Sequence, residues 1–198
     1  MGQPQPRSSG GADDPAGELV VLVDEQDRAV GTAPKATVHH AATPLHRGFS
    51  LFLFDRPGRL LVQQRSAAKR TWPLVWSNSC CGHPARGESA VDAARRRARA
   101  ELGVDPQDLQ IALYPYRYRF ERGGVVENEI CALLVGRVAG EARPEPAEVA
   151  ALRWLAWPEL LEALDADPEA FSPWCAEEAR LLDASPAFAA WLAAVNPG

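Results

Sequence analysis

The chain has 198 residues, 46% of them hydrophobic, and its 26 acidic and 21 basic residues give a formal net charge of −5 at pH 7. This length allows one domain with a full hydrophobic core, and the acidic balance argues against nucleic acid or an anionic membrane as a partner. Four cysteines, two of them adjacent, do not form the pattern of a secreted disulfide framework, so we expect a cytoplasmic protein.

The first 17 residues are rich in Gly, Pro, Ser and Asp and contain no apolar core. We expect residues 1–17 to be a disordered leader, because such a composition buries too little apolar surface to fold. The leader lacks the apolar segment of a signal peptide, and no apolar run in the chain approaches the ~20 residues of a membrane span. The folded domain is therefore expected to occupy residues 18–198.

Strand and helix signals follow one another along the first half of that domain. Residues 18–32 are predicted to form a strand, a polar turn and a strand, and residues 49–55 and 59–65 flank Arg-Pro-Gly as a second hairpin. A helix is predicted next, because apolar residues recur at helical spacing at Val91, Ala94, Ala98 and Leu102. Ser89 can cap its first turn, and Gly103 suits its end.

The second half begins with another hairpin signal, in which residues 109–120 and 125–138 flank Glu-Arg-Gly-Gly. Residues 153–157 are predicted to form a short strand. From Pro158 onward the pattern indicates helices, broken near residues 165–173 and 184–186. Strands, one well-capped helix, more strands and a helical tail predict an α+β domain with a mixed sheet.

The predicted helix lies inside a motif that resembles the Nudix box, a loop-helix-loop whose glutamates hold magnesium against a diphosphate. The matching positions are Gly82, Glu88, Arg96, Glu101 and Gly103. Arg97 and Ala100 stand where the hydrolase motif carries two further glutamates. Because several carboxylates are needed to hold the magnesium that activates water, this box is expected to bind a diphosphate but to hydrolyse it poorly. The alternative is an ordinary amphipathic helix with a basic outer face.

Several segments outside the box extend the resemblance to one family. The chain carries "KATVHHAATPLH", "TWPLVWSNSCCGHP", "GVVENEICALL" and "FSPW". Together with the altered box, they resemble type I isopentenyl diphosphate isomerase from about residue 19 to 174. The resemblance implies a Nudix-like mixed β-sheet flanked by helices in a single domain. It also implies an enzyme of isoprenoid biosynthesis that interconverts isopentenyl and dimethylallyl diphosphate by protonation and deprotonation through a carbocation.

The resemblance implies catalytic roles for Cys81, Glu129, Tyr118 and Trp174. Neighbouring side chains of an extended segment point to opposite faces, so only one of Cys80 and Cys81 can face a cavity, and the family match selects Cys81. Glu127 and Glu129 lie two apart on a predicted strand and therefore share a face. A solvated pair of acids on an edge strand is the other interpretation of these two residues.

The resemblance also implies two cation sites. One divalent ion, manganese, zinc or magnesium, is expected to be held by His39, His46, His83, Glu127 and Glu129. His40 is adjacent to His39, and the match from Lys35 to His46 favours His39. Glu101 is implied to hold a magnesium ion that accompanies the substrate diphosphate. The cations implied to bind that diphosphate are Lys35, Arg65, Lys69 and Arg97.

Two other functions compete with the isomerase. A Nudix diphosphate hydrolase is disfavoured by Arg97 and Ala100. A non-catalytic metal-stabilised or diphosphate-binding module would explain the histidines, but it leaves the opposed cysteine and glutamate without a role. We expect a small isoprenoid diphosphate as the partner, no nucleic acid, no membrane, and a monomer or weak dimer.

Overall fold

A computed structural model describes residues 17–195, so residues 1–16 of the expected leader lie outside the described residues. The strands are β1 (Leu19–Val23), β2 (Ala29–Pro34), β3 (His46–Phe54), β4 (Leu60–Arg65), β5 (Trp76–Ser77), β6 (Cys80–Gly82), β7 (Gln107–Arg122), β8 (Val125–Arg137) and β9 (Val149–Leu155). The helices are α1 (Lys35–Val38), α2 (Ala90–Leu102), α3 (Trp157–Ala166), the 3₁₀ turn η1 (Pro168–Ala170), α4 (Pro173–Asp183) and α5 (Pro186–Val195). None of these described helices combines the length and apolarity needed to cross a membrane.

Strand β3 is the centre of a nine-stranded mixed sheet. It pairs in parallel with β8 from His46 opposite Glu129 to Phe54 opposite Arg137. It pairs antiparallel with β6, where Ser50 lies opposite Cys81. These two pairings bring together segments that are far apart in the sequence, and they place Cys81 and Glu129 beside the same strand.

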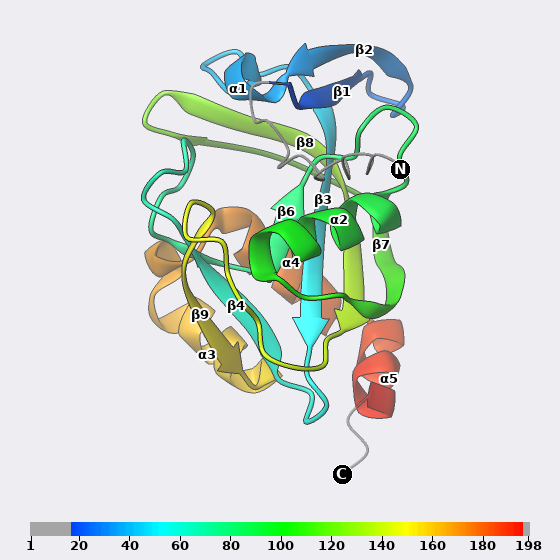
Figure 1. The fold of residues 1–198 in the computed structure, drawn as a ribbon, viewed down its shortest axis with the longest axis vertical. Helices are drawn as coiled ribbons and strands as arrows, with labels where there is room; N and C mark the ends of the chain where they lie inside the picture. The colour runs from blue at the N-terminus through cyan, green and yellow to red at the C-terminus, as the bar shows by residue number, and fades with distance from the viewer. Residues whose placement is uncertain (1–16, 196–198) are drawn as a thin grey trace, which may run out of the picture.

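Helices cover both faces of the sheet, which confirms the expected α+β domain (Figure 1). On one face, Phe49, Leu51 and Leu53 of β3 pack in a core with α2. On the other face, Phe52 and Phe54 pack in a second core with α3, α4 and α5. The alternation of side chains along a strand accounts for this division, and coverage on both faces accounts for the nearly continuous apolar sequence of β3.

Helix α2 forms where its local signals predict. The Ser89 hydroxyl accepts a hydrogen bond from the Asp92 amide, and Gly103 ends the helix in the left-handed conformation with φ of 66°. Such a φ suits glycine because it has no Cβ to clash. The buried face of α2 includes two charged residues one turn apart, Arg97 and Glu101. The helix therefore carries charges into the interior, unlike an ordinary amphipathic helix.

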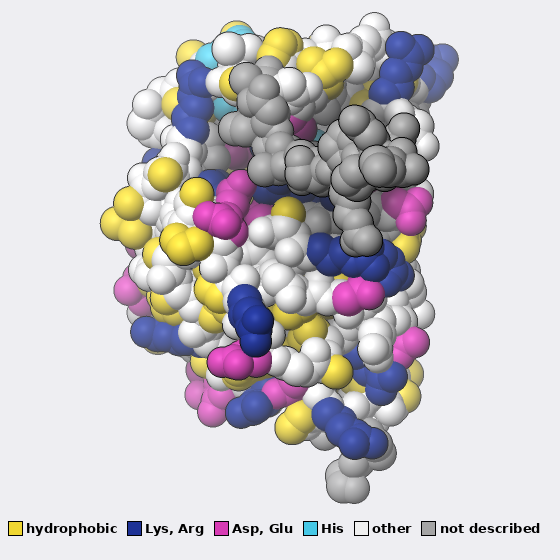
Figure 2. Space-filling model, viewed as in Figure 1, with side chains coloured by type: hydrophobic (Ala, Val, Ile, Leu, Met, Phe, Trp, Pro, Cys, Tyr) yellow, Lys and Arg dark blue, Asp and Glu magenta, His cyan; other side chains and the backbone are white. Residues whose placement is uncertain are grey.

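The other predicted elements are present with one change of partners. The β7–β8 hairpin turns at Gly123 and Gly124, both with positive φ. The β3–β4 pair meets only where Phe54 lies opposite Leu60, because β4 takes β9 and β5 as its main partners. The C-terminal region is helical with the expected breaks. On the face drawn in Figure 2, basic and acidic side chains of the described residues are interspersed.

Candidate active site

A cavity of about 520 Å³ opens between α1, the loop after β4, β6, α2 and β8. This volume is in the range typical of small-molecule sites. All but one of the predicted site residues line it, namely Lys35, His39, Arg65, Lys69, Cys81, His83, Arg97, Glu101, Tyr118, Glu127, Glu129 and Trp174. The exception, His46, is fully buried and touches the cavity through its neighbour Glu129.

Three histidines and a glutamate form a compact buried cluster on one side of this cavity. Ligand atoms of His39, His46, His83 and Glu129 all lie within 4.8 Å of one another. The Nε2 atoms of His46 and His83 lie 3.5 and 3.2 Å from Glu129 Oε1. Parallel pairing of β3 with β8 places His46 opposite Glu129, and β6 leads directly into His83. The cluster is therefore assembled by the sheet.

Unpaired polar atoms in this cluster fit a divalent metal ion. His39 Nε2 lies 3.0 Å from Glu127 Oε2, yet both atoms are buried without a hydrogen-bond partner. His46 Nδ1 donates to the Pro44 carbonyl at 2.8 Å, so in the neutral ring the lone pair is on Nε2, which lies 3.5 Å from Glu129. Burial lowers the pKa of His83 to about 4, which keeps it neutral as a metal ligand must be.

Glu127 and His40 both lie near the cluster in sequence but stand outside its compact group of ligand atoms. The compact group contains Glu129 but not Glu127, which stands beside it against His39. His40 is exposed, and its Nδ1 accepts a hydrogen bond from the Ala42 amide, so it is turned away from the cluster. The choice of His39 over its neighbour therefore agrees with the geometry.

Gly48 is a site residue that the sequence analysis missed. A Cβ at this position would lie 1.8 Å from Glu129 Oε2 and 2.7 Å from Cys131 Sγ. The glutamate side chain thus crosses the backbone of β3 at a point where only glycine leaves room. A glycine inside an otherwise apolar strand was the available signal.

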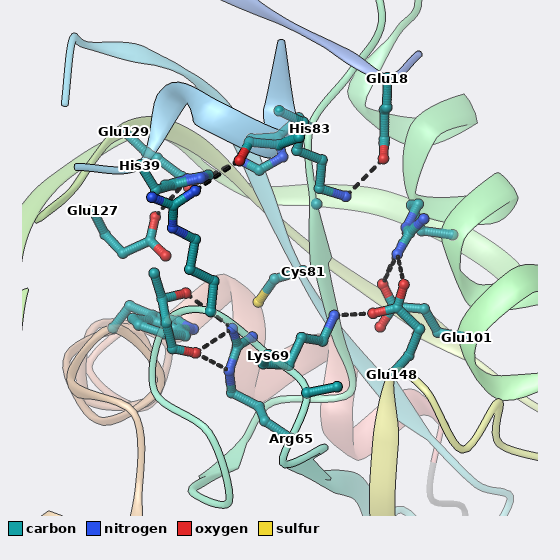
Figure 3. Close-up of a pocket in the computed structure, with 18 of the residues that line it drawn as sticks. Glu18, His39, Arg65, Lys69, Cys81, His83, Glu101, Glu127, Glu129 and Glu148 are labelled. Carbon is teal, nitrogen blue, oxygen red and sulfur yellow. Dashed lines mark hydrogen bonds and ion pairs between the residues drawn. The ribbon is translucent and has the colours of Figure 1, made fainter. Parts of the chain in front are cut away.

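The two adjacent cysteines face different surroundings. Cys80 is fully buried in the core shared with α2, whereas Cys81 lines the cavity. Figure 3 shows the Cys81 sulfur directed into the cavity, between the histidine–glutamate cluster and the basic side chains. Burial raises the pKa of Cys81 to about 12, so the sulfur holds its proton at neutral pH.

Opposite the histidine–glutamate cluster, charged side chains from three segments form a buried network (Figure 3). Arg97 pairs with Glu101 on the same helix and, at 3.1 Å, with Glu148 from the segment before β9. Lys69 also pairs with Glu148. Burial opposes ionisation of Glu148, but Lys69 and Arg97 outweigh it and lower its pKa to about 2. The expected diphosphate cations are present here, but they already have acidic partners.

The other two expected cations also have partners. Lys35 Nζ lies 2.8 Å from a carboxylate oxygen of Glu18. The Arg65 guanidinium donates to the Thr71 carbonyl at 2.8 Å and lies 5.4 Å from the ring centroid of Trp174. Arg65 therefore holds the loop after β4 and forms a cation–π contact with Trp174. These contacts depend on the fold and carry no signal in the sequence.

Aromatic rings close the inner wall of the cavity. Tyr118 and Trp174 are stacked with centroids 6.0 Å apart, and Phe120 stacks on the other side of Tyr118. Tyr118 lies opposite Glu129 in the β7–β8 register. A hydrogen bond between these two side chains, which would serve the catalytic role implied for Tyr118, is not among those of residues 17–195. Ring stacking fixes the orientation of Tyr118 instead.

Comparison with known proteins places this architecture in a class. A model of the NUDIX domain matches residues 44–175. The solved structure of DR0079 from Deinococcus radiodurans is similar with a TM-score of 0.66 and 24% identity, covering 82% of this chain and 98% of that one. At that identity the likeness concerns the fold, and it agrees with the sheet and helices described above.

Two curated relatives are similar along most of their length. A protein of Mycolicibacterium vanbaalenii is 50% identical over 169 residues, covering 85% of this chain and 93% of the relative. One of Klebsiella pneumoniae is 45% identical over 179 residues, covering 90% and 97%. Both are named isopentenyl-diphosphate Delta-isomerase. The chain belongs to the Nudix family and, within it, to the isopentenyl-diphosphate Delta-isomerases.

Proposed function

We propose that this chain interconverts isopentenyl diphosphate and dimethylallyl diphosphate, and that Cys81 and Glu129 carry the two proton transfers. The observation that supports this assignment is the position of these two side chains. They enter one cavity from different strands, β6 and β8, between a basic network and a pair of stacked aromatic rings. A thiol and a carboxyl facing one small cavity are suited to adding a proton at one carbon and removing another from a second carbon.

The reaction requires a strong local acid, because an unactivated alkene is a poor base. In the forward direction a proton from Glu129 adds to the terminal carbon of the double bond and leaves a tertiary carbocation. Turnover in this direction requires that the proton of the Cys81 thiol has first passed to the Glu129 carboxylate. Cys81, now a thiolate, takes a proton from the neighbouring methylene on the diphosphate side, and the new double bond forms. In the reverse direction the two residues exchange roles, as microscopic reversibility demands.

The surroundings of these groups suit a cationic intermediate. Tyr118 and Trp174 are both buried, and their stacked rings line the cavity. The face of an aromatic ring attracts a desolvated cation with ~2 kcal/mol or more. Exclusion of water also prevents capture of the carbocation as an alcohol.

The basic side chains of the buried network, together with Lys35 and Arg65, are proposed to bind the diphosphate. Lys69 and Arg97 would exchange their contacts with Glu148 for phosphate oxygens, while Lys35 and Arg65 approach from the other side of the cavity. Arginine and lysine are the usual phosphate ligands, arginine often in a bidentate manner. Glu101 is proposed to hold a magnesium ion that accompanies the diphosphate, which would release it from its pairing with Arg97.

A divalent ion is proposed in the buried cluster, held by His39, His46, His83 and Glu129, with Glu127 as a fifth ligand. Imidazoles favour zinc, and carboxylates also accommodate manganese or magnesium, so these three are the candidates. When bound, the ion would fix the Glu129 carboxyl and increase its acidity. The monomeric or weakly dimeric state and the cytoplasmic location stay predictions.

The experiment is an assay of both isomers with phosphate release measured in the same samples. We expect interconversion of the two diphosphates, loss of activity after chelation, recovery on adding back a divalent metal, and negligible phosphate release. Phosphate release without isomerisation would instead identify a hydrolase. Binding of inorganic diphosphate without either reaction would identify a non-catalytic module.

A further inference from the structure

Glu178 is a fully buried acid that the proposed chemistry has not used. It lies on α4, on the face that packs against the sheet, among the buried residues Trp174, Cys175, Ala179 and Leu182. Its Oε1 accepts a hydrogen bond from the Ser50 hydroxyl at 2.7 Å, and its Oε2 is buried without a partner. No ion pair within residues 17–195 includes it. A carboxyl group at such a position needs an explanation, because its burial costs free energy.

Ser50 links this acid to the cavity. Ser50 lies opposite Cys81 in the β3–β6 pairing, and its Oγ is 3.6 Å from the Cys81 sulfur. The three side chains therefore form a continuous chain from α4 through β3 to the cavity wall. The Ser50 hydroxyl has one hydrogen and donates it to Glu178, so it presents an oxygen lone pair to the sulfur, whereas a rotated hydroxyl would donate to the sulfur instead.

Asn78 holds the same sulfur from a second direction. The Asn78 amide nitrogen donates to the carbonyls of Leu51 and Cys80 at 3.2 and 3.1 Å, which leaves its Oδ1 as the acceptor. The Cys81 thiol donates to that Oδ1 at 3.2 Å. Ser50 and Asn78 thus define the direction of the thiol. Asn78 is already fixed by the two backbone carbonyls, so only Ser50 needs a further group to fix its own orientation.

We propose that Glu178 is a positioning residue that orients the Cys81 thiol through the Ser50 hydroxyl. This inference rests on the proposed function, because the orientation of the thiol matters to turnover only if Cys81 transfers a proton. Burial raises the pKa of Glu178 well above its usual range, and among residues 17–195 only the hydrogen bond from Ser50 opposes that shift. A neutral acid provides the hydrogen bond to Ser50 without placing a full negative charge near the thiol.

Packing alone does not require an acid here. A leucine of similar size would suit the apolar face of α4 and would remove the cost of burying a polar group. The carboxyl group is therefore expected to contribute to function at the expense of stability. This expectation separates a positioning role from a structural one, because the two predict opposite changes in stability when the acid is replaced.

The test compares Glu178→Gln, Glu178→Leu and Ser50→Ala with wild type, with Glu177→Gln, an exposed neighbour on the same helix, as the control. Loss of one oriented hydrogen bond is expected to lower kcat about tenfold in Glu178→Leu and in Ser50→Ala, with KM within about twofold. Glu178→Gln keeps the acceptor oxygen and should retain kcat within about twofold. Glu178→Leu should melt no lower than wild type.

A double variant tests whether the two residues act in one chain. Glu178→Leu with Ser50→Ala should be no slower than either single variant, because both remove the same orientation of the thiol. A double variant whose loss of kcat equals the product of the two single losses would overturn the proposal. Wild-type kcat in Glu178→Leu would overturn it as well. A Glu178→Gln variant as slow as Glu178→Leu would also overturn it, because the acidic proton itself would then be required.

One measurement is independent of turnover. In protein labelled with ¹³C at the cysteine Cβ, the Cys81 signal, assigned by its loss in Cys81→Ala, should move in Glu178→Leu and Ser50→Ala but not in Glu178→Gln. An unmoved signal in Glu178→Leu would overturn the proposal even where activity falls. If wild type does not isomerise, the proposed function fails, and the NMR result still decides whether Glu178 orients the thiol.

Discussion

Cys80 and Cys81 are neighbours in β6, yet their sulfur atoms lie on opposite sides of the sheet. Cys80 is fully buried in the core against α2, and Cys81 lines the cavity with its thiol donating to Asn78. The pleat of an extended strand produces this separation. Of these two chemically identical side chains, only Cys81 can contact a substrate in the cavity.

Alanine substitution of the two cysteines should therefore have different effects. Cys81→Ala is expected to abolish isomerisation while the protein stays folded, because the group that exchanges a proton with carbon is gone. Cys80→Ala leaves a small cavity and should cost about 1 kcal/mol of stability with near wild-type kcat. Steady-state kinetics and chemical denaturation of both variants provide the check. Equal loss of activity in both would show that the wrong thiol was chosen.

The histidine cluster predicts a matched set of metal-binding variants. His39→Ala, His46→Ala and His83→Ala should each lower bound metal and activity together, since each removes one ligand from the buried group. His40→Ala is the control, because this neighbour is exposed and turned away from the cluster. Elemental analysis beside turnover makes the comparison. A variant that loses activity at full metal content would remove that histidine from the ligand set.

Placing a hydrolase-type glutamate at position 97 should lower both the stability and the catalytic efficiency of the protein. Arg97 is buried between Glu101 and Glu148, so Arg97→Glu would bring three carboxylates together. Breaking a buried ion pair in this way costs about 3–5 kcal/mol, and the diphosphate would also lose a cation. Arg99→Glu, on the exposed side of the same helix, should cost at most about 1 kcal/mol. Denaturation and kinetics decide, and an Arg97→Glu variant with wild-type stability and efficiency would contradict the assigned role.

The low pKa of Glu148 predicts a dependence of stability on pH. Its pKa is about 2 in the folded chain against an ordinary value of 4.5, so between these values the unfolded chain binds more protons. The stabilisation from Glu148 is then complete above pH 4.5 and is lost as the pH falls toward 2. The stability difference between wild type and Glu148→Gln should shrink from pH 6 to about pH 3.5. Urea denaturation at both pH values measures it, and a constant difference would refute the assigned ion pairs.

Much of the fold was predictable because its signals are local. The N-cap Ser89 and the left-handed Gly103 mark the ends of α2, and glycines mark the β7–β8 turn. The parallel pairing of β3 with β8 was not predictable, because it joins segments more than 80 residues apart and depends on tertiary packing. That pairing is what places His46 opposite Glu129.

The site divides in the same way. Cys81 and His83 belong to one short motif in the sequence, and both line the cavity. Glu148 and Glu178 lie outside the segments that carry the resemblance, and their partners are set by the fold. Glu178 nevertheless left a signal, since it occupies an apolar position of the α4 face between Trp174 and Leu182. An acid within such a stripe is a reason to look for a buried polar network.

The central claim, that two groups of the protein add one proton and remove another, is tested most directly by isomerisation in heavy water. Acidic groups that exchange with solvent deliver deuterium, so dimethylallyl diphosphate made from isopentenyl diphosphate should carry deuterium in a methyl group over many turnovers. Proton and deuterium NMR of the product, with Cys81→Ala as the inactive comparison, make this measurement. The account predicts solvent deuterium in the product of the wild-type protein and no product from Cys81→Ala. Conversion without solvent deuterium, or full conversion by Cys81→Ala, would contradict it.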